Sequence, residues 1–280
     1  STSEEDKRET NDDNDKNNDS ESNANKDYSK GVSDFQGYST TNNNLNYLIK
    51  ATFSKKEVYI NDYVDAEVRL FARDELQVTN YEPLKFPTQA WTENYELKTN
   101  YIGRTRINGL IYSEYLIEKK RFYISKEGSY TVEPAILNFN GLTGRGFFSY
   151  PERMSLSTKG EKIVVKPLPE AKDSNFYGLV GDFSYTSSLS TSSIKEKDAT
   201  TLTIKVGGNG NMQNLKDIKY KIDGKGLEVY SSKSNVVDSG GTKTKIWEVL
   251  LVGQKVGKYK IELENLTFFN PETASYKTIK

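Results

Sequence analysis

The chain has 280 residues, of which 35% are hydrophobic and 12% aromatic, and its 39 basic and 39 acidic side chains give a formal net charge of zero. It contains no cysteine and no histidine, which excludes disulfides, thiolate metal sites, histidine-dependent catalytic triads and most zinc sites. The charge balance gives no electrostatic footprint for nucleic acid, so we expect no nucleic-acid partner.

Residues 1–27 form an acidic, asparagine-rich stretch with ten acidic and four basic side chains and one aliphatic residue, Ala24. Such a stretch cannot bury enough apolar surface to offset the entropy of the chain. The low complexity continues through "GYSTTNNN". We therefore predict a disordered linker over residues 1–45. Because the chain begins with Ser1 rather than Met, we also expect it to be part of a longer protein.

From Tyr47 onwards the hydrophobic pattern has a period of two. Between Val64 and Leu70 every second residue is apolar and the residues between them are charged, which is typical of a half-buried strand. Asn108-Gly109 lies between two β-rich runs and is the preferred pair for a type I′ hairpin turn. Since no long stretch has a period of 3.6 residues, we predict an all-β protein.

The chain contains a weak internal repeat. Residues 53–70, "FSKKEVYINDYVDAEVRL", align without gaps with residues 189–206, and residues 121–132, "RFYISKEGSYTV", align with residues 250–261. Each unit has the size and turn spacing of an immunoglobulin-like β-sandwich without the cysteine pair. We predict two tandem immunoglobulin-like sandwiches, at residues 46–170 and 171–280.

The segment "KPLPEAKDSNFYGLVGDF" joins the two units. Pro167 and Pro169 lack the backbone N–H and fix φ, so they end the last strand of the first unit. Gly178 and Gly181 permit tight turns before the first strand of the second unit. This connection predicts a short, stiff joint that restricts the angle between the units.

Several stretches together resemble one family. They are "ATFSKKEVYINDYVDAEVRLFA", "NYEPLKFPTQAWTENYE", "RTRINGLIYSEYLIEKKRFYISKEGSYTVEPAILNF", "VVKPLPE", "FYGLVGDFSYTSSLS" and "LEVYSSKS". Over residues 47–280 the chain resembles the BatD family of bacterial aerotolerance operons. The most specific feature is the order Pro-Leu-Pro, then Gly-x-Val-Gly-Asp-Phe, then a second β unit.

The resemblance implies a cell-envelope protein of the oxygen tolerance family. Similar chains have a signal peptide, several β-sandwich domains facing the periplasm or exterior, and a C-terminal membrane helix. Their operon neighbours include membrane-anchored von Willebrand factor A proteins, and no enzymatic activity is established for the family. The implied protein is periplasmic or envelope-located, membrane-anchored through segments outside this chain, and bound to other envelope proteins. The family assigns no functional residues.

Four aromatic residues are candidate partner contacts. Trp91 and Tyr95 lie in an irregular region after "YEPLKFP", and Phe147 and Phe148 follow the glycine-rich "GLTGRG". Exposed aromatic side chains are good contact anchors. The alternatives are that Trp91 closes one end of the sandwich and that the two phenylalanines pack inward from a strand. "GGNGN" (207–211) lacks the ending of a phosphate loop and is interpreted as a plain loop.

These observations favour a non-catalytic envelope protein that binds other proteins, with a role in aerotolerance or envelope stress through von Willebrand factor A domains. A Glu or Asp on a loop would complete the coordination of the metal that those domains hold. The alternative is an adhesin or carbohydrate-binding module, which requires a row of exposed aromatic side chains. We expect no catalytic residues, no cofactor and no metal site in this chain.

Overall fold

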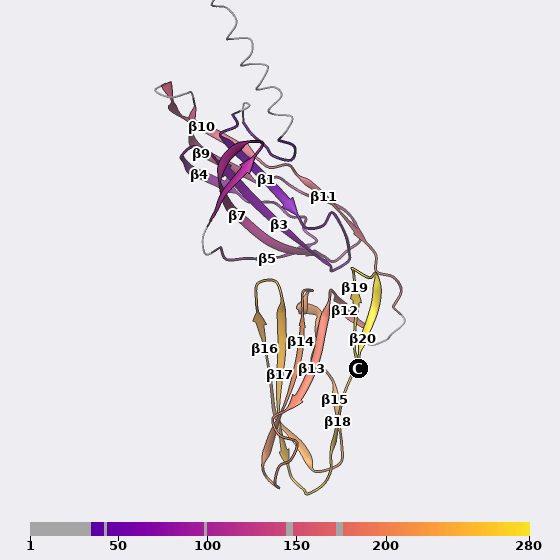
Figure 1. The fold of residues 1–280 in the computed structure, drawn as a ribbon. Coiled ribbons are helices and arrows are strands. Elements are labelled where there is room, and N and C mark those ends of the chain that lie inside the picture. Colours follow the sequence, from indigo (N-terminus) through magenta and orange to yellow (C-terminus); the bar gives the residue numbers. More distant parts are fainter. Residues whose placement is uncertain (1–34, 42–43, 98–99, 144–147, 172–175) are drawn as a thin grey trace, which may run out of the picture.

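A computed structural model describes residues 35–41, 44–97, 100–143, 148–171 and 176–280. Over these residues the secondary structure is almost entirely β, which confirms the predicted all-β class (Figure 1). The 3-10 helix η2 (Met212–Asn214) is short. No helix among these residues combines the length and apolar composition needed to cross a bilayer.

Domain 1 comprises the strands from β1 to β11. They are β1 (Tyr47–Phe53), β2 (Glu57–Tyr59), β3 (Tyr63–Ala72), β4 (Leu76–Glu82), β5 (Ala90–Asn94), β6 (Tyr101–Ile107), β7 (Leu110–Ile124), β8 (Gly128–Val132), β9 (Ile136–Thr143), β10 (Tyr150–Ser157) and β11 (Glu161–Lys166). One sheet has the order β1-β3-β7-β5, with β6 also paired to β7, and a second has the order β10-β9-β4. These are the A-B-E-D and G-F-C orders of an immunoglobulin sandwich.

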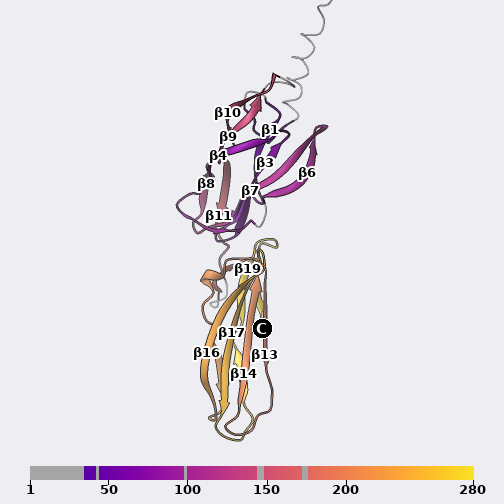
Figure 2. The same cartoon turned by 90° about the vertical axis from the view of Figure 1, so that its left-hand side faces the viewer.

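Domain 2 comprises the strands from β12 to β20. They are β12 (Phe176–Val180), β13 (Phe183–Leu189), β14 (Ala199–Gly208), β15 (Tyr220–Asp223), β16 (Leu227–Asp238), β17 (Lys243–Gly253), β18 (Lys260–Leu263), β19 (Leu266–Asn270) and β20 (Ser275–Ile279). The four-stranded sheet β13-β14-β17-β16 again has the A-B-E-D order. It packs on β12-β19-β20 and β15-β18, and the two domains follow each other along one long axis (Figures 1 and 2).

Each domain has its own apolar core, built from the alternating residues of facing sheets. In domain 1 the fully buried side chains include Phe122 and Ile163, and in domain 2 they include Leu251 and Phe269. The predicted alternation from Val64 to Leu70 is confirmed, because the four apolar residues are at most 3% exposed. Core packing of this kind supplies stability to both domains.

Residues that align in the internal repeat also make equivalent strand pairs in the two domains. Phe53 pairs with Ala66 across β1 and β3, and the aligned residues Leu189 and Leu202 pair across β13 and β14. The pairing of β3 with β7 likewise matches the pairing of β14 with β17, residue for residue, from Tyr63 to Val68. After Val68 a bulge shifts the register of the domain 1 pair. The two sandwiches are therefore superposable copies of one unit at the level of individual strand pairs.

The repeat extends to an unusual turn. Asn61 and Lys197 occupy aligned positions, and both have a positive φ, 63° and 67°, which non-glycine residues seldom adopt. The amide of Asn61 donates to the carbonyl of Ile124, and the amide of Lys197 donates to the aligned carbonyl of Gly253. A shared strained turn is stronger support for duplication than the weak similarity of the two sequences.

The end of the N-terminal linker differs from the prediction. Residues 35–45 were expected to be disordered, but Phe35 is only 6% exposed and Tyr38 packs edge-on against Phe71 with 5.2 Å between ring centroids. Ser39 also pairs with Ile49 of β1. The predicted linker is therefore too long, because these few aromatic residues cover the outer face of the first sheet. Residues 1–34 lie outside the described residues.

The predicted hairpin turn and the predicted end of the last strand of domain 1 are both confirmed. Asn108 and Gly109 both have positive φ, at 47° and 85°, and connect β6 to β7 in the predicted hairpin. β11 ends at Lys166, immediately before Pro167. After the prolines the structure differs from the prediction. The strand β12 forms in this connection and pairs in parallel with β19.

Candidate functional site

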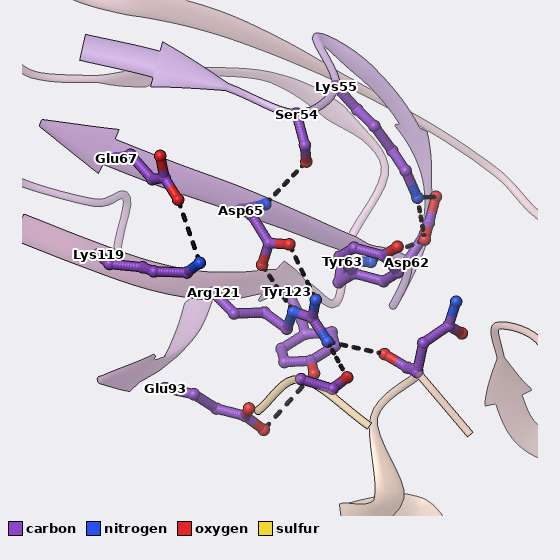
Figure 3. Close-up of polar contacts among 12 residues, drawn as sticks. Ser54, Lys55, Asp62, Tyr63, Asp65, Glu67, Glu93, Lys119, Arg121 and Tyr123 are labelled. Carbon is purple, nitrogen blue, oxygen red and sulfur yellow. Dashed lines mark hydrogen bonds and ion pairs between the residues drawn. The ribbon is translucent and has the colours of Figure 1, made fainter. Parts of the chain in front are cut away.

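The two domains contact each other through side chains of β2, β5 and β7 in domain 1. Their partners in domain 2 are the loop after β14, the β16–β17 hairpin with the start of β17, and β19. One half of this joint is polar and centres on Arg121 of β7 (Figure 3). The other half is aromatic and centres on Tyr59 and Phe269. Since each half comes from strands that are distant in sequence, the joint forms only after both sandwiches fold.

Arg121 makes a bidentate ion pair with Asp65. The two residues face each other in the register of β3 and β7. Nε donates to one carboxylate oxygen of Asp65 at 2.7 Å, and Nη2 donates to the other at 2.8 Å. The planar guanidinium is suited to this two-point contact, which fixes its orientation.

The remaining guanidinium nitrogen extends to domain 2. Arg121 Nη1 donates to the carbonyl oxygens of Asn209 and Gly241 at 3.1 and 2.6 Å. Asn209 directly follows β14, and Gly241 lies at the tip of the β16–β17 hairpin. One side chain therefore ties two separate loops of domain 2 to the sheet of domain 1.

The electrostatic surroundings keep Arg121 charged. Its residue exposure is only 7%, and this burial by itself lowers the pKa. The hydrogen bonds and negative charge of Asp65 outweigh burial and raise the pKa of Arg121 above its ordinary value. The guanidinium also lies over the ring of Tyr63, 4.0 Å from the centroid. A buried cation with this many partners is a fixed structural element.

A second ion pair lies beside Arg121. Lys243 of β17 contacts Glu93 of β5 through a short hydrogen bond, and both side chains are mostly buried, at 20% and 13% exposure. The Lys243 ammonium is also 5.8 Å from the ring centroid of Trp91. Trp91 in turn stacks on Tyr123, with ring centroids 5.4 Å apart. The pair therefore links the edge strand β5 of domain 1 to the first residue of β17 in domain 2.

The aromatic half of the joint lies on the proline side. Tyr59 of β2 packs edge-on against the fully buried Phe269 of β19, with ring centroids 4.8 Å apart. The hydroxyl of Tyr276 donates to the carbonyl oxygen of Pro169 at 2.7 Å. This bond attaches the proline-rich connection to β20 of domain 2. The predicted restriction of the joint is therefore supported by contacts as well as by the prolines.

Glycines let two segments of domain 2 approach each other next to Arg121. A Cβ on Gly210 would lie 2.0 Å from the carbonyl oxygen of Val180, and one on Gly181, where φ is 145°, would lie 2.8 Å from Asn209 Oδ1. That Oδ1 accepts a hydrogen bond from the Asp182 amide. The plain loop predicted at 207–211 thus packs on the Gly-x-Val-Gly-Asp segment, and this contact positions the Asn209 carbonyl that Arg121 binds.

The acidic side chains at the joint are paired with basic side chains. No group of three or more Asp or Glu side chains that could hold a metal ion occurs in the part of the chain that the structure describes. The acids at the joint, Asp65 and Glu93, are each neutralised by a cation. These ion pairs can set the angle between the two sandwiches.

The candidate aromatic residues do not gather at one place. Trp91 and Tyr95 lie near the joint, where burial raises the pKa of Tyr95. Phe148 is 86% exposed beside the β9–β10 connection, and Phe147 lies outside the described residues. Trp91 is 36% exposed and stacks on Tyr123 of its own domain, so the carbohydrate alternative stays a prediction.

The residues that form the polar joint were not identified from the sequence. Asp65 was assigned to the charged outer face of its strand, and Arg121 was used only in the repeat alignment. The repeat alignment contains a feature that sets these two residues apart: Asp65 aligns with Thr201, and Arg121 aligns with Leu250. A charged pair in one copy where the other copy has neutral residues points to a function specific to domain 1.

The β6–β7 hairpin projects from domain 1 (Figure 2). Figure 2 shows β6 and the start of β7 standing out from the body of domain 1, and Ile102 and Ile111 of this hairpin are 50% and 51% exposed. Arg104 and Arg106 are also exposed. The hairpin therefore presents a mixed apolar and basic surface to solvent.

Comparison with known proteins gives one family match. The sequence model described as "BatD DUF11 like domain" matches residues 187–280, which make up almost all of domain 2. No curated protein matches this chain.

Two solved structures, both titled "Marsupial T cell receptor", have low similarity. They are 12% and 13% identical, with TM-scores of 0.19 and 0.18, and each match covers 78% of this chain. The matches cover 61% and 94% of the receptor chains, so this chain spans less than two thirds of the first. TM-scores of this size carry no argument about the fold. The identification rests on the second sandwich: residues 187–280 are similar to the family described as BatD DUF11 like domain.

Proposed function

We propose that this chain is a non-catalytic module of the bacterial cell envelope that binds other envelope proteins. Its two sandwiches are held by the joint at a defined angle, and the β6–β7 hairpin projects from the far end of domain 1. The observation that carries the proposal is the exposure of Ile102 and Ile111 on this hairpin. Exposed apolar side chains on a projecting element are typical of protein contact sites.

We further propose that the partners are von Willebrand factor A-domain proteins and that the association serves aerotolerance or envelope stress. The support is the BatD-like match together with the placement of exposed acids at the same end of domain 1. Asp74 and Glu75 are exposed in the turn between β3 and β4. A carboxylate in such a turn is able to complete the coordination of a divalent metal held by a partner.

The test is capture of purified von Willebrand factor A domains from the same organism by the immobilised chain, in Mg²⁺ and in EDTA. We expect binding in Mg²⁺ that weakens when Ile102→Asp and Ile111→Asp are introduced together, and that is lost in EDTA or in Asp74→Asn with Glu75→Gln. The control is Val236→Asp, because Val236 is similarly exposed on domain 2. No binding under either condition would overturn the proposed partner.

A further inference from the structure

The two sides of the β6–β7 hairpin have different surroundings. In an antiparallel pair, residues that lie opposite each other point to the same side of the sheet. On one side of the hairpin, Ile107 of β6 and Tyr112 of β7 are buried in a cluster with Phe35 and Phe71. The neighbours of Ile107 and Tyr112 along each strand therefore point to the other side.

This other side continues the core-facing side of the first sheet. Tyr115 of β7 lies opposite the buried core residue Leu70 and packs against the core of domain 1. Ile111 lies an even number of positions before Tyr115, so it points to the same side. Arg106 lies opposite Ile111, and Arg104 is the next residue of β6 on this side. We call the side of the hairpin that carries Arg104, Arg106 and Ile111 the open face.

The open face is exposed, although it continues a side that the sandwich buries elsewhere. Arg104 and Arg106 are exposed, and Ile111 is 51% exposed. Tyr101, which lies opposite Tyr115, is 46% exposed, and the centroids of these two rings are 5.5 Å apart. The hairpin thus leaves aliphatic and aromatic surface uncovered, which is typical of a site that another molecule covers.

The charge of the open face is positive. Neither Arg104 nor Arg106 takes part in an ion pair between described residues. Glu114 of the hairpin points to the opposite side and pairs with Arg69 of β3. Arg106 Nη1 donates to the carbonyl oxygen of Gly109 at 3.0 Å, which orients the guanidinium and uses one of its five donors. The remaining donors suit carboxylates of another molecule.

We propose that the open face binds an acidic surface of a partner protein. Arg104 and Arg106 bind carboxylates of this surface, and Ile111 packs against an apolar residue between them. Charge complementarity carries the proposal, because two arginine side chains beside an exposed aliphatic residue fit an acidic surface with an apolar centre. The proposal rests on the function proposed above for the hairpin and adds the charge of the partner surface.

The positions of the apolar residues favour a protein over a lipid surface. The turn at the tip of the hairpin is Asn108-Gly109, which is polar, and Ile107 beside it is only 9% exposed. Tyr101 and Ile111 lie along the hairpin and away from this turn. An element that inserts into a bilayer has to present its apolar residues to the acyl chains. The open face instead presents a flat mixture of apolar and basic side chains.

The first test uses a probe of defined charge. Methyl NMR of the full chain follows Ile111 during titration with a short peptide of aspartate and leucine, and with the same peptide in which lysine replaces each aspartate. We expect a shift with the acidic peptide alone. Arg104→Gln with Arg106→Gln should weaken its binding about tenfold. Arg153→Gln with Lys162→Gln is the matched control, because it removes two exposed cations from β10 and β11 and should bind as wild type does.

Three results of this titration would overturn the proposal. They are a shift of Ile111 with the lysine peptide, equal binding by the arginine variant and its control, and no response to the acidic peptide. Binding of the hairpin to phosphatidylglycerol vesicles without a response to the acidic peptide would identify a lipid surface and would also overturn it.

A second measurement separates this proposal from the proposed function. For von Willebrand factor A domains, the arginine variant should associate about tenfold more slowly than wild type at low salt, with a smaller difference at high salt. Equal association rates of the two proteins would overturn the acidic surface and leave the proposed partner standing. Absence of binding to these domains, together with the expected response to the acidic peptide, would overturn the proposed partner and support the acidic surface.

Discussion

Arg121 and Asp65 lie directly opposite each other on neighbouring strands of domain 1, and the guanidinium that Asp65 orients also binds two carbonyl oxygens of domain 2. An ion pair between two strands of domain 1 therefore also positions a side chain that contacts domain 2. The angle between the sandwiches therefore depends on a side chain whose orientation is set within one of them. Four predictions follow from the joint, the close glycine contact and the charges of the first sheet.

Replacement of Arg121 by lysine should loosen the joint without unfolding domain 1. Lysine keeps the charge but cannot hold Asp65 by two bonds while donating to Asn209 and Gly241, so we expect a loss of about 1–3 kcal/mol in the interdomain contact. Small-angle scattering and rotational correlation times measured for each domain report the change. Arg73→Lys is the control, because Arg73 is exposed. Identical tumbling of wild type and Arg121→Lys would contradict this role.

The Lys243–Glu93 pair should show coupling in a charge-swap cycle. Each single reversal, Lys243→Glu or Glu93→Lys, places like charges in a mostly buried contact, whereas the double reversal restores opposite charges. We expect the double variant to recover about 1 kcal/mol relative to the sum of the single variants. Denaturant unfolding of all four proteins measures this coupling. Strict additivity would show that the pair contributes nothing to the joint.

Gly210→Ala should destabilise domain 2 selectively. The new methyl group would overlap the Val180 carbonyl oxygen, which is backbone and cannot rotate away, so we expect a loss of about 2–3 kcal/mol. Gly257→Ala is the matched control, since its methyl group would meet only the side chain of Tyr259, at 3.2 Å. Calorimetry should show a lowered transition for domain 2 in the first variant alone. Equal effects of both substitutions would argue against a close backbone approach at Gly210.

Glu67→Gln should remove part of the acid sensitivity of domain 1. Burial by itself raises the pKa of Glu67, but the hydrogen bonds and positive charges of Arg69 and Lys119 lower it by more, so the pKa lies below the ordinary value of 4.5. A lowered pKa in the folded state contributes stability above the unfolded value and loses it as pH falls through the folded value. The advantage of wild type over Glu67→Gln should therefore be present at pH 7 and shrink below pH 4.5. An advantage that stays constant down to pH 3 would disprove the shift.

The fold was largely predictable because its signals are local. The alternation from Val64 to Leu70, the Asn108-Gly109 turn and the prolines after Lys166 each depend on a few neighbouring residues. The N-terminal segment was misjudged for the opposite reason. Phe35 is buried in a cluster with residues of β1, β3, β6 and β7, which its polar neighbours in the sequence do not indicate.

The sequence alone determined two copies of a β-sandwich, because period-two hydrophobicity and turn residues act over short distances. The tertiary structure decided which charged residues meet. Asp65, Arg121, Asn209 and Gly241 come from both domains, and their contact depends on strand register and on how the two sandwiches dock. Relations of this kind are set by packing over the whole chain, and no local pattern encodes them.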